Sequence, residues 1–145
     1  MIEAGGLTLD LGAINWFAVI VSVIFAMAFG TVYYLPQTVG RYWMEALGIT
    51  VEEIGARGNQ AQAMGVAVIG AIVSVISIAI LIQLADAYSF IGGLFIGVLA
   101  AVGLVLAPMG TRYIFEGRPL KLYIVNGVEN SVSLIVISLI LALWK

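Results

Sequence analysis

The sequence predicts an all-α, polytopic membrane protein with four transmembrane helices in an antiparallel bundle and a short interfacial helix between the first two. Composition is the first evidence, since 63% of the residues are hydrophobic and only 10% are charged, too little polar surface for a water-soluble domain. The second is a set of four apolar segments that carry one formal charge between them, Glu129. Each can cross a hydrocarbon layer of about 30 Å, which takes roughly 20 helical residues. These segments cover residues 11–40, 58–85, 87–111 and 122–144.

The first transmembrane helix is predicted at about residues 14–35, because Pro36 disfavours helix at the residue before it. An interfacial segment follows at residues 38–58. Its first part has apolar residues at intervals of three and four before Gly48, a suitable C-terminal cap. Thr50-Val51-Glu52-Glu53 then has the pattern of a capping box, which favours a further helical turn or two.

The remaining transmembrane helices are predicted at about residues 62–85, 88–111 and 122–144. Little more than Asp86 separates the second from the third, so these two form a hairpin. Pro108 removes a backbone donor and is expected to bend or end the third helix. Residues 112–121 are predicted as an inner turn. All 145 residues form a single membrane domain.

The basic residues predict the orientation, because lysine and arginine favour cytoplasmic loops. Five of them fall in the loops after the first and third helices, against only Lys145 on the other side. We therefore expect both termini outside and these two loops in the cytoplasm. The five are Arg41, Arg57, Arg112, Arg118 and Lys121.

Small residues predict which helices pack closely. The third helix carries Gly93, Gly97 and Ala101 at intervals of four, and the second carries Gly70 and Ser74. Since close backbone approach through small residues holds helices together in lipid, we expect the second and third helices to pack on these faces. The alternative is that one such face recruits another subunit.

A polar face on the fourth helix is the main candidate site. Asn126, Glu129, Asn130 and Ser133 recur at i, i+3, i+4 and i+7 and so share one side of the helix. Glu129 lies roughly 12 Å along the helix from Lys121, and a carboxylate at that depth must be paired, hydrated or protonated. Two interpretations follow. Glu129 has a functional role, as a proton or ion relay or as a contact with a polar ligand, or it fixes helix packing through hydrogen bonds.

No catalytic, cofactor or metal site is predicted. Cysteine and histidine are both absent, which excludes thiolate chemistry, disulfides, the usual zinc sites and the commonest haem ligands. No basic patch is available for nucleic acid. The candidate contacts with lipid or a protein partner at the interface are Arg41, Trp43, Glu116, Arg118 and Lys121.

Several segments carry a family resemblance. They are Asn15-Trp16, Tyr33–Pro36, Gly40–Met44, Leu47–Thr50 and Phe115–Asn126. Together they resemble the DUF1761 family of small bacterial and archaeal membrane proteins, from whose pattern Glu129 and Asn130 depart. The resemblance implies a four-helix protein of the plasma (inner) membrane with no established activity.

Three classes of function fit the sequence. The preferred one is an accessory or structural subunit of a larger membrane complex, or a homo-oligomer, with lipids and protein subunits as partners. The second is a small proton, ion or solute transporter that uses Glu129. The third is a membrane enzyme acting on lipid or quinone, for which no nucleophile, base and orienting residue can be assembled.

Overall fold

The computed structural model describes residues 2–4, 6–56 and 59–145. Within them, four helices are long and apolar enough to cross a membrane. The predicted all-α fold with four such helices is confirmed. They are α1 (Trp16–Tyr33), α4 (Gln60–Leu84), the continuous run of α5 (Phe90–Leu99), η2 (Ala100–Leu106) and α6 (Ala107–Phe115), and α7 (Leu120–Leu143).

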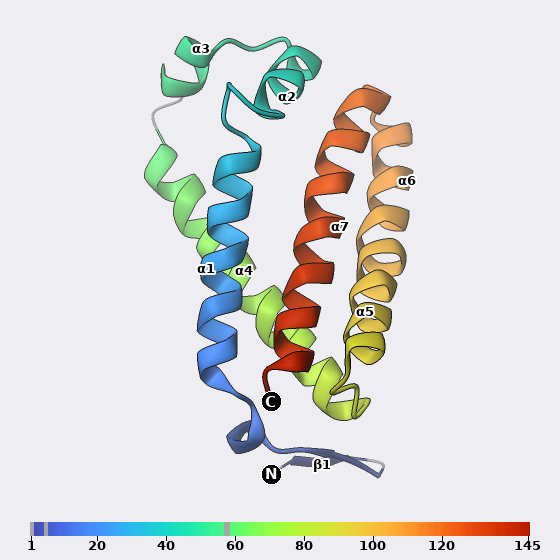
Figure 1. The fold of residues 1–145 in the computed structure, drawn as a ribbon. Coiled ribbons are helices and arrows are strands. Elements are labelled where there is room, and N and C mark those ends of the chain that lie inside the picture. Colours follow the sequence, from blue (N-terminus) through green and yellow to red (C-terminus); the bar gives the residue numbers. More distant parts are fainter. Residues whose placement is uncertain (1, 5, 57–58) are drawn as a thin grey trace.

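The four long helices alternate in direction along the chain (Figure 1). The two short helices α2 (Gly40–Leu47) and α3 (Val51–Ala56) lie at one end of the molecule with the turn between α6 and α7. Both termini and the turn between α4 and α5 lie at the other end. α7 contacts α1, α4 and α5, whereas α4 runs obliquely across the molecule. The sides of the membrane on which these ends lie remain a prediction.

The interfacial segment has the two local signals that the sequence predicted. Gly48 ends α2 in the left-handed conformation, with a φ of 66° that glycine adopts without steric cost. Before α3, the Thr50 N–H donates to Glu53 Oε2 at 2.8 Å, and the Glu53 N–H donates to Thr50 Oγ at 3.3 Å. The predicted capping box is therefore formed.

The N-terminal segment forms a small antiparallel hairpin that the sequence did not predict. Its strands are β1 (Ile2–Ala4) and β2 (Leu7–Leu9), followed by the 3-10 turn η1 (Leu11–Ala13). The Asp10 N–H donates to Gln83 Oε1 at 3.2 Å, and Gln83 Nε2 donates to the Asp10 carbonyl oxygen at 2.8 Å. These two bonds fasten the segment to the end of α4.

The main apolar core lies in the half of the molecule that holds the termini. It joins Ile14, Ala18 and Val19 to residues of α5, η2 and α7. α4 contributes to it with its second half alone, and all four buried α4 residues lie there. They are Val75, Ile78, Ala79 and Ile82.

Gly93 and Gly97 of the third spanning helix pack against α7, not against α4. A Cβ atom at Gly93 would lie 2.7 Å from Ala142 Cβ, and one at Gly97 would lie 2.8 Å from Ile135 Cα. Ser138 Oγ also donates to the Gly93 carbonyl oxygen at 2.6 Å. The expected pairing of the second and third helices on these faces is wrong, because α7 covers the face that Gly93 and Gly97 form.

The third spanning helix continues through Pro108 to Phe115, so residues 112–115 are helical and not part of an inner turn. The seven residues before α6 form a π-helix. Its wider turns give the proline ring room beside the preceding carbonyl groups, and the missing N–H falls at the junction of two helix types. Pro108 therefore does not end the helix. The turn follows at Gly117, which has a φ of 62°.

Candidate functional site

A cavity of about 520 Å³ lies between α1, α4 and α7. It is lined by the second half of α1, the first half of α4 and the middle of α7, in the half of the molecule away from the main core. Most of its lining is apolar. The polar residues in its wall are Thr31, Tyr34, Ser74, Glu129, Asn130 and Ser133.

Glu129 lies in the cavity wall facing α1. A Cβ atom at Gly30 would lie 3.7 Å from Glu129 Oε1, so the carboxylate is within van der Waals distance of this position on α1. Within the described part of the chain, Glu129 makes no hydrogen bond and no ion pair. The described residues also hold no group of three acidic side chains that could bind a metal ion. The cavity therefore has one acidic group with its acceptor atoms free.

Asn126 is not among the residues that line the cavity, and it joins three helices. Tyr34 Oη donates to Asn126 Oδ1 at 2.8 Å, and Asn126 Nδ2 donates to Tyr113 Oη at 2.7 Å. A neighbouring bond runs from Tyr33 Oη to the Val125 carbonyl oxygen at 2.9 Å. The sequence missed these partners because tyrosine at the end of a span also suits the headgroup region.

The other predicted members of the polar face line the cavity with Glu129. Asn130 Nδ2 donates within its own helix to the Asn126 carbonyl oxygen at 2.8 Å. Ser133 is buried. The shared helix face therefore has two parts: one amide that ties helices together, and three side chains at the cavity.

Two residues predicted to pack helices line this cavity instead. Ser74 and Gly70 both lie in its wall. A Cβ atom added at Gly70 would have no neighbouring atom within 4 Å. The prediction of close packing at these two positions is wrong, because the first half of α4 stands away from its neighbours. Ala101, also predicted to pack, is buried.

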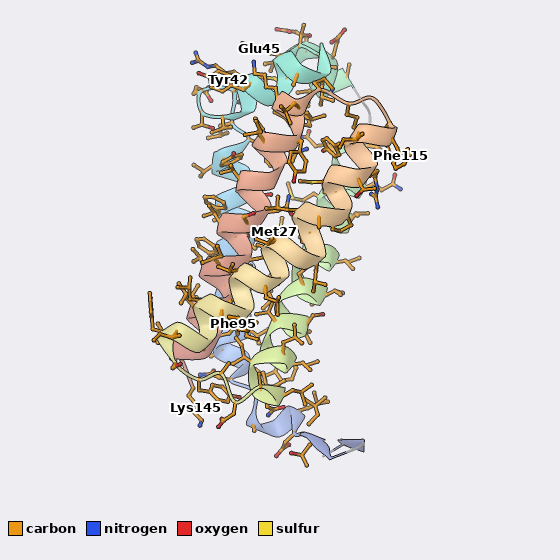
Figure 2. The ribbon with its side chains drawn as sticks, turned by 90° about the vertical axis from the view of Figure 1, so that its right-hand side faces the viewer. Met27, Tyr42, Glu45, Phe95, Phe115 and Lys145 are labelled. Atoms are coloured by element: carbon orange, nitrogen blue, oxygen red, sulfur yellow. The ribbon has the colours of Figure 1, made fainter. Side chains whose placement is uncertain are left out.

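The predicted interfacial residues form two groups at the α2 end of the molecule. Lys121 Nζ donates to Glu45 Oε2 at 2.7 Å and lies 5.0 Å from the centre of the Tyr42 ring. Because of this bond, the pKa of Glu45 is below its ordinary value. Arg41 Nη2 donates to the Tyr42 hydroxyl at 2.6 Å, and Trp43 packs edge-on against Tyr34. Figure 2 shows Tyr42 and Glu45 at this end and Lys145 at the other.

The second group is at the turn between α6 and α7. Arg118 forms an ion pair with Glu116, and its guanidinium carbon lies 5.2 Å from the centre of the Tyr113 ring. These contacts hold both charged side chains close to the helix ends. Binding of lipid or a protein partner by either group stays a prediction.

The comparisons with known proteins identify the family of this chain. A family model described as "Protein of unknown function (DUF1761)" matches residues 17–142. No curated protein and no solved structure matches the sequence. The matched range contains α2 to α6 entirely and nearly all of α1 and α7. The chain therefore belongs to the DUF1761 family.

Proposed function

We propose that the protein binds a small, largely apolar solute inside its membrane-spanning helices, as a small transporter must. The observation that carries the proposal is the Glu129 carboxylate, free of partners among the described residues, in the wall of the cavity of about 520 Å³. Small-molecule sites typically measure about 300–1,000 Å³ and combine apolar walls with a few polar groups. An ionisable side chain within a membrane-spanning helix typically marks a solute or ion path.

The position of α4 supports entry of a solute from the side. Its first half is mostly exposed, including Met64, Ala67 and Gly70 in the cavity wall. The cavity is therefore open along this part of α4, where the lipid acyl chains would lie. A solute that partitions into the bilayer can reach Glu129 without crossing the packed core.

Filling the cavity tests the proposal. We expect Gly70→Leu to abolish binding, because the new side chain extends from an open position in the wall. Gly65→Leu is the matched control, since Gly65 lies on the same helix with equal space but outside the cavity. The measurement is labelling in lipid nanodiscs by the neutral probe 3-trifluoromethyl-3-phenyldiazirine, mapped by mass spectrometry.

In the wild type and in Gly65→Leu, we expect saturable labelling of cavity residues such as Met27 and Ala71. Gly70→Leu should lose the saturable part and keep the linear labelling of residues that face lipid. Labelling of Met27 and Ala71 that never saturates in the wild type would contradict the proposal.

A second candidate function is that of a subunit in a complex or a homo-oligomer. Gly103, in η2, has open space around its Cβ position, and the adjacent Val102 and Leu104 are exposed. Small residues allow close approach of another helix in lipid. This face is therefore available to a second copy or to another membrane protein.

The absence of cysteine from the sequence allows a direct test of self-association. We expect Gly103→Cys to form disulfide-linked dimers in native membranes under mild oxidation. Val66→Cys, exposed on α4, should form few. Equal crosslinking at both positions, or none at position 103, would count against a homo-oligomer through this face.

A further inference from the structure

The polar groups of the cavity indicate the chemical class of its ligand, and this inference rests on the function proposed above. We propose that the cavity selects a monovalent organic cation with an apolar body, such as a protonated amine or a quaternary ammonium compound. The inference follows from charge, from hydrogen-bond chemistry and from the apolar walls.

The charge of the cavity is complementary to a cation. Among the described residues of its wall, the ionisable side chains are the carboxyl group of Glu129 and the phenol of Tyr34. No described basic residue lines the cavity. At this end of the molecule, Lys121 pairs with Glu45 and Arg118 with Glu116. A carboxylate in a low-dielectric cavity is stabilised by a bound cation and repels an anion. An anionic solute is therefore excluded.

Most hydroxyl hydrogens at the α1 side of the cavity are already used. Thr31 Oγ donates to the Met27 carbonyl oxygen at 2.7 Å, and Tyr34 Oη donates to Asn126 Oδ1. Since a hydroxyl has one hydrogen to donate, these two oxygens offer only lone pairs to a ligand. Thr31, Tyr34 and Glu129 all line the cavity, so its α1 side presents hydrogen-bond acceptors. Such a wall suits an ammonium group with N–H donors or a positively charged methyl shell.

The apolar walls distinguish an organic cation from a metal ion. A calcium ion takes about six to eight oxygen ligands, and magnesium demands six in near-octahedral geometry. The described residues place a single carboxylate at the cavity, and most of the other lining residues are apolar, Leu134 and Ile137 among them. These surfaces contribute nothing to an inorganic ion but bury hydrocarbon well.

Three compounds of nearly equal shape test the inference. Benzyltrimethylammonium is a cation, neopentylbenzene is its neutral isostere, and benzylsulfonate is an anion. Each competes with the neutral diazirine probe for the cavity in phosphatidylcholine nanodiscs, after correction for its partition into lipid. For the wild type, we expect the cation to compete at least about tenfold more strongly than neopentylbenzene, and the anion not at all.

Glu129→Gln should reduce the ratio of cation to neutral affinity to about one, while neopentylbenzene still competes. Retained competition by the neutral compound shows that this variant is folded. Glu116→Gln is the control, since it removes an acid outside the cavity, and it should keep the cation preference.

The two proposals fail in different ways. If neopentylbenzene competes and the cation has no advantage, or if Glu129→Gln keeps the advantage, the ligand class is wrong and the binding function stands. If none of the three compounds competes in the wild type, both the binding function and the ligand class are overturned.

Discussion

Replacing Gly97 by alanine is expected to destabilise the protein by about 2 kcal/mol. The added Cβ atom would lie 2.8 Å from Ile135 Cα and 3.1 Å from Ser138 Cβ, so the third spanning helix and α7 must separate. Overpacking of this kind costs about 3 kcal/mol, and the better helix propensity of alanine returns up to about 1 kcal/mol. The measurement is reversible unfolding in mixed micelles, followed by circular dichroism.

Gly103→Ala is the matched control for this variant. Gly103 lies on the same continuous helix, and a Cβ atom there meets nothing within 4 Å. We expect a neutral effect or a gain of up to about 1 kcal/mol from helix propensity alone. Equal stability of the two variants would show that α5 and α7 do not pack through Gly97.

Replacing Asn126 by leucine is expected to cost about 2 kcal/mol. The change removes both bonds to the Tyr34 and Tyr113 hydroxyls, which join α1 and α6 to α7. A hydrogen bond between membrane helices is worth about 0.6 kcal/mol on average, and a buried hydroxyl left without a partner adds about 1 kcal/mol or more. The same unfolding measurement checks this value.

Asn130→Leu is the control that removes an amide side chain without breaking the hydrogen bonds to Tyr34 and Tyr113. Asn130 donates only to the backbone of its own helix, so we expect at most a third of the effect of Asn126→Leu. Tyr113→Phe should reproduce roughly half of that effect, and combining it with Asn126→Leu should add little, since the two share one bond. Additive losses in the double variant would refute a direct interaction.

The spanning helices were predictable because they depend on composition over about 20 residues. Long apolar segments leave no other way to satisfy their backbone in lipid. Local signals were equally readable: Gly48 ends α2 and Thr50 caps α3 as their types suggest. These features depend on neighbours in the sequence and not on which helix lies opposite.

The pairing of helices was not predictable from the same patterns. Gly93 and Gly97 mark a face that permits close approach, but nothing in their spacing says that the partner is α7 rather than α4. Gly70 has the same small size and borders empty space. A row of small residues therefore shows that another helix can approach that face closely. Which helix does so depends on the tertiary structure.

The candidate site was predictable only in part for a related reason. Periodicity placed Asn126 and Glu129 on one face of a helix, which is correct. It did not show that Tyr34 and Tyr113 take up the Asn126 amide while the Glu129 carboxylate remains free in a cavity. Tyr34 and Asn126 are 92 residues apart in the sequence, so their hydrogen bond follows from the tertiary structure alone.

The uneven burial of α4 means that one end of this helix is fixed by packing and the other end is free to tilt. The fixed end contains the buried residues that begin at Val75. Gln83 also holds this end through its hydrogen bond to the Asp10 carbonyl oxygen. The exposed part, residues 60–74, is about 20 Å long at 1.5 Å per residue. A tilt of roughly 5° therefore moves the start of α4 by roughly 2 Å. A small rotation about the packed end would therefore change the width of the cavity beside the first half of α4.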